Sequence, residues 1–257
     1  MIFVDKLEKA ARTNNSLVCV GLDSDFGRLP QSVKRKKFPQ FYFNKSIIDA
    51  TADLVMAYKP NCAFYEARGA DGIEQLKMTC DYIRKACPDT IIIIDAKRGD
   101  ISTSNKASAE FVFDYLHSDA VTVQSYLGNE PLLPFLERKE KGTFVLCRTS
   151  NPGAGQVQDL RVGTEPLYTH IAKKVVNEWN KNGNCLMVVG ATYPRELSQV
   201  RKLAGDMWLL IPGIGAQGGD VEKTVKAGQN SKGEGMIINS SRSIIFASDP
   251  RRDTAHL

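Results

Sequence analysis

Histidine is scarce in this chain of 257 residues, which contains only three. His117, His170 and His256 all occur in stretches with helical spacing, and none stands in a loop that follows an apolar segment. A histidine general base, a Ser-His-Asp triad and a histidine-rich metal site are therefore disfavoured. The sequence also has no G-x-x-x-x-G-K-[ST] segment, which excludes a P-loop. Proton transfer would then fall to a lysine or a carboxylate.

Paired cysteines and a leader segment are missing as well. Residues 1–15 have an amphipathic helical pattern without a long apolar stretch, which indicates neither a signal peptide nor a membrane anchor. The six cysteines show no C-x-x-C or other paired spacing, and four of them (Cys19, Cys62, Cys147, Cys185) lie in apolar, strand-like runs. We expect reduced core residues and a cytoplasmic protein. The final Ala-His-Leu loosely resembles the peroxisomal S-K-L address, which gives an alternative location.

The charge balance is mild, with a net charge of +5 and 25% charged residues. The one basic run, Lys34–Lys37, stands between Pro30 and Pro39, so a solvated loop is favoured over a nuclear address or a nucleic-acid patch. No basic stripe interleaved with aromatic residues occurs, and we expect no nucleic-acid partner. An anionic small substrate fits the positive net charge as well as a nucleic acid does.

Apolar runs alternate with segments of helical spacing along the chain. The runs are Leu17–Gly21, Tyr58–Tyr65, Thr90–Ile94, Ala120–Val123, Gly142–Cys147, Cys185–Val189, Met207–Ile211 and Gly235–Ile238, and the helical segments include Ser46–Ala57, Gly72–Ala86, Ser104–Leu116, Thr164–Trp179 and Asp220–Ala227. Eight strands in this alternation predict an α/β fold, a (β/α)8 TIM barrel formed by residues 1–257 as one domain. A doubly wound open sheet is the alternative, but the first run ends in GLDSDFG where G-x-G-x-x-G is expected.

The end of the chain is short for this fold. Residues Ser241–Leu257 leave little room for an eighth helix, and Arg252–Leu257 has the pattern of a helix start with Asp253 as its N-cap. We expect the last helix to be incomplete. A domain cut from a longer, bifunctional chain is one explanation that stays open.

The third apolar run carries the densest group of charges. Four isoleucines predict a fully buried strand, which is followed by Asp95, Lys97 and Asp100. Asp95 and Lys97 should point to the same side of the strand, and Gly99 permits a turn that brings Asp100 back towards them. An ion-paired loop with a purely structural role is the alternative. The carboxylates could attract Mg²⁺, but Lys97 competes as a cation, so we expect no metal.

Polar residues also follow the other predicted strands. Asp23 and Asp25 follow the first, while Lys59 and Asn61 stand near the start of the second. Arg148–Gly153 forms a polar turn after the fifth, either a plain Asn-Pro-Gly turn or one that presents backbone amides.

The last two predicted strands are followed by candidate phosphate-binding elements. Pro212–Gly219 is glycine-rich and leads into a helix, so its backbone amides could approach an anion, and Ser241 and Arg242 add a hydroxyl and a guanidinium. Because barrel enzymes often bind phosphate after strands seven and eight, we expect a phosphate site here.

Six of these segments together resemble a known family, the orotidine 5'-phosphate decarboxylases. They are D-A-K-R-G-D-I at 95–101, V-G-L-D at 20–23, K-P-N at 59–61, T-S-N-P-G at 149–153, P-G-I-G-A-Q-G-G at 212–219 and S-R-S at 241–243. The six segments follow one another in the same order as in that family, and they span nearly the whole chain. The K-P-N and T-S-N-P-G forms are similar to those of the family's longer-sequence branch.

The resemblance implies a homodimeric barrel that converts orotidine 5'-phosphate to UMP and CO₂ without cofactor or metal. Lys97 would donate the proton to C6 of the pyrimidine, and Asp95 would face the substrate carboxylate. Lys59, together with Asp100 of the partner subunit, would complete a row of side chains with alternating charge. The remaining implied ligand contacts are Asp23 and Lys59 at the ribose with Asp100 and Ser104 from the partner, Ser150 at the base, and Gln217 and Arg242 at the phosphate. Further expected substrate-binding residues are Ile101, Gly213, Gly215, Gly218 and Ser241. Ser104 stands where relatives often carry threonine.

Two alternatives to this function stay open. A sugar-phosphate decarboxylase that shares D-x-K-x-x-D would need Mg²⁺, and a binding module would hold a nucleotide phosphate without turnover. The family also occurs fused to an orotate phosphoribosyltransferase, which would explain a chain taken from a longer protein.

Overall fold

The computed structural model describes residues 2–215 and 217–247. Eight parallel strands form a closed barrel in the order β1-β10-β9-β8-β5-β4-β3-β2. They are β1 (Val18–Gly21), β2 (Ala57–Lys59), β3 (Ile91–Arg98), β4 (Ala120–Val123), β5 (Gly142–Arg148), β8 (Cys185–Val189), β9 (Leu209–Pro212) and β10 (Met236–Ser240). The predicted barrel is therefore confirmed. A two-stranded antiparallel hairpin, β6 (Arg161–Val162) and β7 (Glu165–Pro166), lies outside it.

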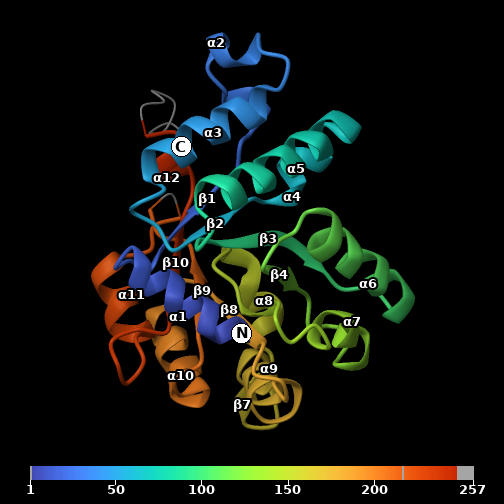
Figure 1. The fold of residues 1–257 in the computed structure, drawn as a ribbon. Coiled ribbons are helices and arrows are strands. Elements are labelled where there is room, and N and C mark those ends of the chain that lie inside the picture. Colours follow the sequence, from blue (N-terminus) through green and yellow to red (C-terminus); the bar gives the residue numbers. More distant parts are fainter. Residues whose placement is uncertain (1, 216, 248–257) are drawn as a thin grey trace.

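Helices surround the barrel (Figure 1). The α-helices are α1 (Phe3–Thr13), α2 (Gln31–Lys34), α3 (Pro39–Thr51), α4 (Cys62–Glu66), α5 (Gly69–Ala86), α6 (Ser102–Ala109), α7 (Leu133–Leu136), α8 (Gly155–Gln158), α9 (Leu167–Lys174), α10 (Pro194–Ala204), α11 (Val221–Gly228) and α12 (Arg242–Ile245). Short 3₁₀ segments are η1 (Phe26–Arg28), η3 (Glu130–Leu132) and η4 (Pro152–Ala154), and α6 and α9 continue as π-helical η2 (Glu110–Tyr115) and η5 (Val175–Trp179).

The barrel has two apolar layers that follow the alternation of strand side chains. Ile91 and Ile93 of β3 belong to an inner cluster inside the barrel, whereas Ile92 and Ile94 belong to an outer cluster between strands and helices. Phe3 and Leu7 of α1 are fully buried members of the inner cluster, so α1 covers the amino ends of the strands. All six cysteines are buried free thiols, as predicted, and burial raises the pKa of Cys19 and Cys185 to about 12.

The second predicted strand is wrong in its extent. It ends at Lys59, and the apolar residues that follow Pro60 form α4 because the Asn61 side chain accepts from the Ala63 amide and caps that helix. Lys59 therefore stands at the end of β2 and not near its start. The helix predicted from Ser46 is also displaced, since α3 begins at Pro39 and ends at Thr51.

Within the described residues, the eighth helix is represented by a single turn. α12 begins at Arg242, directly after β10, and Phe246 behind it stacks on Phe43 of α3 with ring centroids 5.2 Å apart. This contact joins the last described segment to the first half of the barrel. The helix start predicted at 252–257, with Asp253 as its cap, lies outside the described residues.

Candidate active site

A cavity of about 470 Å³ opens at the carboxyl ends of the strands. Inward-facing positions at the ends of the strands supply much of its wall. On β3, Asp95 follows Ile93 at the next inward position, and on β4 Thr122 follows Ala120 in the same way. The lining residues are Asp23, Lys59, Asn61, Asp95, Lys97, Thr122, Gln124, Leu146, Thr149, Ser150, Asn151, Gln158, Val188, Leu210, Pro212, Gly213, Ile214, Gln217, Asn239 and Ser241.

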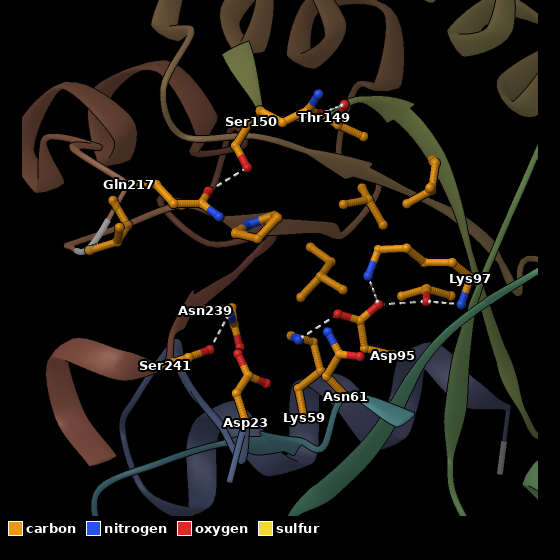
Figure 2. Close-up of a pocket in the computed structure, with 18 of the residues that line it drawn as sticks. Asp23, Lys59, Asn61, Asp95, Lys97, Thr149, Ser150, Gln217, Asn239 and Ser241 are labelled. Carbon is orange, nitrogen blue, oxygen red and sulfur yellow. Dashed lines mark hydrogen bonds and ion pairs between the residues drawn. The ribbon is translucent and has the colours of Figure 1, made fainter. Parts of the chain in front are cut away.

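One carboxylate at the floor of the cavity holds two ammonium groups. Asp95 Oδ2 accepts from Lys59 Nζ at 2.7 Å, and Asp95 Oδ1 accepts from Lys97 Nζ at 2.7 Å (Figure 2). The Lys59 side chain is only 4% exposed, whereas that of Lys97 is 45% exposed. Lys59 is thus a fixed partner of Asp95, and Lys97 is the ammonium that a bound molecule can reach.

The cluster keeps Asp95 and Lys59 charged. Burial opposes the charge of Asp95, but Lys59 and Lys97 outweigh it and hold the pKa of this carboxyl below its ordinary value. Burial likewise opposes the charge of Lys59, and the Asp95 and Asp23 carboxylates raise its pKa above the ordinary value. The structural ion pair considered as an alternative is therefore present, but it lies in a cavity wall and not in a solvated loop.

The wall opposite the charged cluster carries the neutral polar side chains of Ser150 and Gln217 (Figure 2). Ser150 Oγ donates to Gln217 Oε1 at 2.5 Å, which joins the turn after β5 to the glycine-rich loop after β9. The turn is itself held from behind, because Gln158 Oε1 accepts from the Thr149 amide at 2.8 Å. Arg148 below it is buried and lies 3.1 Å from Asp159. This turn is more than a plain Asn-Pro-Gly turn, since its side chains line the cavity.

Two buried acceptors beside the cluster lack a hydrogen-bond donor among the described residues. They are Asp23 Oδ1 and Asn239 Oδ1. A buried acceptor without a donor is costly, so both side chains would gain if they turned towards the cavity and accepted from a bound molecule, such as a sugar hydroxyl. Asp25, by contrast, does not line the cavity and caps η1 by accepting from the Gly27 amide.

The glycine-rich loop Pro212–Gly219 was expected to present its backbone amides to an anion, and it does so only in part. Gly213 lines the cavity with φ +108°, but the Gly218 and Gly219 amides donate to carbonyls inside the loop, and the Asp220 side chain caps α11. These two amides and the helix start are therefore not open to an anion, which corrects that part of the expectation.

Arg242 lies beside this loop without lining the cavity. It is exposed at the start of α12, and a Cβ on Gly215 would lie 2.5 Å from Ser243 Oγ, so the loop and the helix pack closely. Ser241, at the end of the same strand, does line the cavity. Gly215 and Gly218 are not among the lining residues.

The turn expected to return Asp100 to Asp95 and Lys97 does not do so. Asp100 is exposed and lines a separate hollow with Arg98, Gly99 and Asn105. Its amide donates to Asn105 Oδ1 at 3.1 Å, which directs the chain outwards into α6. The single-chain interpretation of Asp100 is wrong. Ile101 and Ser104 are also exposed and stand apart from the cavity.

Some lining residues were not predicted. Thr122 and Gln124 follow Ala120 at inward positions, and a polar residue at such a position in an otherwise apolar strand was a usable signal. Gln158 follows the turn by several residues, and the strand pattern gives no indication of it.

A closed eight-stranded barrel with ionised side chains at its carboxyl ends defines the class of this protein as a TIM-barrel enzyme. A family model described as "Orotidine 5'-phosphate decarboxylase / HUMPS family" matches residues 16–256, and the chain belongs to that family.

Curated relatives are similar over nearly the whole chain. An orotidine 5'-phosphate decarboxylase of Cellvibrio japonicus is 49% identical over 252 residues, which cover 97% of this chain and 91% of the relative. One from Janthinobacterium sp. (strain Marseille) is 48% identical over 247 residues, covering 96% and 90%.

Solved structures agree with these relatives. The Leishmania donovani OMP decarboxylase has a TM-score of 0.85 at 39% identity and covers 98% of this chain and 94% of its own. The Leishmania donovani UMP synthase has a TM-score of 0.88 at 39% identity, and this chain spans 54% of that longer protein.

Proposed function

We propose that this chain converts orotidine 5'-phosphate to UMP and CO₂ in pyrimidine biosynthesis. The observation that carries the proposal is the Lys59–Asp95–Lys97 cluster at the floor of a cavity of about 470 Å³, in a chain of this family. An ammonium that is exposed to the cavity stands beside a carboxylate that stays charged. This pairing suits a reaction in which a carboxylate leaves and a carbanion forms.

The chemical step follows from these two groups. The bond between C6 and the carboxyl carbon breaks, CO₂ leaves, and the electron pair stays on C6 of the pyrimidine. Lys97 Nζ stabilises that pair and then transfers its proton to C6. Asp95 faces the substrate carboxylate, and two such charges 4 Å apart repel by up to ~4 kcal/mol at an effective dielectric constant near 20. The repulsion disappears as neutral CO₂ forms.

The other walls suit the rest of the nucleotide. Asp23, with its unpartnered buried oxygen, and Lys59 would hold the ribose. Ser150 would contact the base, while Gln217 and Arg242 would bind the phosphate. Binding energy from the remote phosphate can then be used at the reacting carbon.

We also propose a homodimer in which Asp100, Ile101 and Ser104 reach the partner's cavity. Their support is their position, since all three are exposed and stand away from the cavity of their own chain. Mixing Lys97→Ala chains with Asp100→Ala chains should restore activity, because one of the two sites in a mixed dimer would be intact. Mixtures as inactive as the parent variants would contradict this arrangement.

The proposed activity is tested by incubation with orotidine 5'-phosphate and excess chelator. Consumption of substrate with release of UMP is expected, because neither catalysis nor binding is assigned to a metal. Activity that the chelator removes would favour a Mg²⁺-dependent decarboxylase of the same family. UMP binding without turnover would favour a binding module.

In the parts of the chain that the structure describes, the helices are too short or too polar to cross a bilayer. We propose a cytoplasmic enzyme. The sequence of the complete gene product decides whether an orotate phosphoribosyltransferase is fused to it.

A further inference from the structure

Strands β3 and β4 change register beside the charged cluster. Ile94 pairs with Val121 and Arg98 pairs with Val123, so three residues of β3 stand opposite the single residue Thr122 of β4. Two of those three are Asp95 and Lys97. The irregularity re-aims both side chains, as bulges near active sites often do.

Lys97 has an unusual backbone conformation within this irregularity. Its φ is +47°, in the left-handed region that residues with a Cβ rarely adopt. Such a conformation persists only where the surroundings over-determine it. The bulge also removes the Lys97 amide from regular pairing along the ladder, so this amide needs another acceptor.

Thr122 supplies that acceptor and reaches Asp95 at the same time. Its Oγ1 accepts from the Lys97 amide at 3.0 Å and donates to Asp95 Oδ1 at 2.9 Å. The residue is 1% exposed, so water does not compete for either bond. The Thr122 hydroxyl thereby connects the backbone of Lys97 to the Asp95 carboxylate, which the Lys97 side chain also binds.

We propose that Thr122 is a positioning residue for the decarboxylation, a role that rests on the proposed function of the cavity. Its hydroxyl fixes the left-handed backbone of Lys97 and the orientation of the Asp95 carboxylate. The ammonium of Lys97 is thereby placed where the carbanion develops. A displacement of about 1 Å at such a group can cost about 100-fold in rate.

The test compares Thr122→Val, which keeps the shape and removes the hydroxyl, with Thr122→Ser, which keeps the hydroxyl. Thr143→Val is the matched control, because Thr143 pairs with Val121 on the next strand, is equally buried, and its hydroxyl has no partner among the described residues. Thr122→Val should lower kcat about 10- to 100-fold, the loss expected for hydrogen bonds to charged groups, and change KM less than about threefold. Thr122→Ser should stay within about threefold of the parent, and Thr143→Val should not change kcat.

A kcat of Thr122→Val near that of the parent would overturn the proposal, as would Thr122→Ser being equally impaired. Should Thr122→Val fail to fold, Thr122→Ala removes the same hydroxyl without adding bulk. A crystal structure of the variant supplies a readout that does not depend on turnover. Lys97 should leave its positive φ, or its Nζ should move from the 2.7 Å contact with Asp95 Oδ1. An unmoved Lys97 contradicts positioning, whereas an inactive parent protein contradicts only the proposed function.

Discussion

The amino and carboxyl ends of the barrel interior use the same strands but opposite kinds of side chain. At the amino end, Phe3 of α1 packs edge-on against Phe144 of β5, with ring centroids 6.1 Å apart. Gly142 makes room for it, since a Cβ there would lie 2.1 Å from the Phe3 ring. At the carboxyl end, Asp95 and Lys59 occupy inward positions as a buried ion pair.

The two ends therefore differ in what they contribute. Burying an apolar side chain stabilises the fold, whereas the desolvation of a buried ion pair cancels much of its own attraction. The amino end can be specified for stability alone. The carboxyl end retains charges that are costly to bury, and this cost is reasonable where the charges act on a substrate. Variants at the two ends should separate stability from activity.

Lys97→Ala should give the largest effect on activity. Removal of the ammonium deletes both the stabilising charge and the proton donor, so kcat should fall by at least about 10³-fold. The side chain is 45% exposed, so the free energy of unfolding should change little. Steady-state assays with orotidine 5'-phosphate and urea unfolding measure the two quantities. Activity near that of the parent would refute the role of Lys97.

Asp95→Asn should lower both the activity and the free energy of unfolding. The change leaves the buried Lys59 ammonium without its closest carboxylate, which we expect to cost about 3–5 kcal/mol in the free energy of unfolding, along with most of the activity. Asp89→Asn is the control, because it breaks the exposed pair with Lys9 on α1 and should cost less than about 1 kcal/mol. Equal losses in the two variants would contradict the importance of burial.

Phe3→Ala should have the opposite effect to Lys97→Ala, with a large loss of stability and an unchanged kcat. Loss of a fully buried ring should lower the free energy of unfolding by about 3–5 kcal/mol. The kcat of the folded fraction should stay that of the parent, because the substitution lies at the end opposite the cavity. Urea unfolding and assays at low temperature check both points, with Phe3→Leu as the milder control. A specific loss of kcat would show that the two ends are coupled.

Acid should remove the contribution of Asp95 at the carboxyl end to stability. The pKa of Asp95 is lowered in the folded protein, so its contribution to stability is present above its unfolded value of about 4 and is lost as pH falls through the folded value. Lys59, whose pKa is raised, contributes below about pH 10.4 and loses that contribution as pH rises further. Urea unfolding at pH 3 and pH 7 should show a smaller loss in Asp95→Asn than in the parent. Identical losses would mean that other carboxylates dominate.

The sequence predicted the barrel because strand alternation and apolar runs are local signals. The isoleucine run before Asp95 placed this residue and Lys97 on one side correctly. The second strand was overextended because the residues after Pro60 are as apolar as a strand, and only the cap at Asn61 turns them into a helix. Asp100 was placed wrongly because a glycine allows a turn without fixing its direction. Thr122 was missed because its importance comes from a register change between two strands, which a single strand does not show.

Ser150→Ala should give the smallest effect and define the neutral wall of the cavity. The hydroxyl donates to Gln217 and lies opposite the charged cluster, so its loss should raise KM roughly fivefold, about 1 kcal/mol, and change kcat little. Ser46→Ala, on the exposed face of α3, should change neither constant. Should Ser150→Ala lower kcat while leaving KM unchanged, the neutral wall would act in the chemical step, and the division between a binding wall and a reacting cluster would be wrong. The result expected here instead leaves the reacting groups on β2 and β3, with the far wall serving to hold the nucleotide against them.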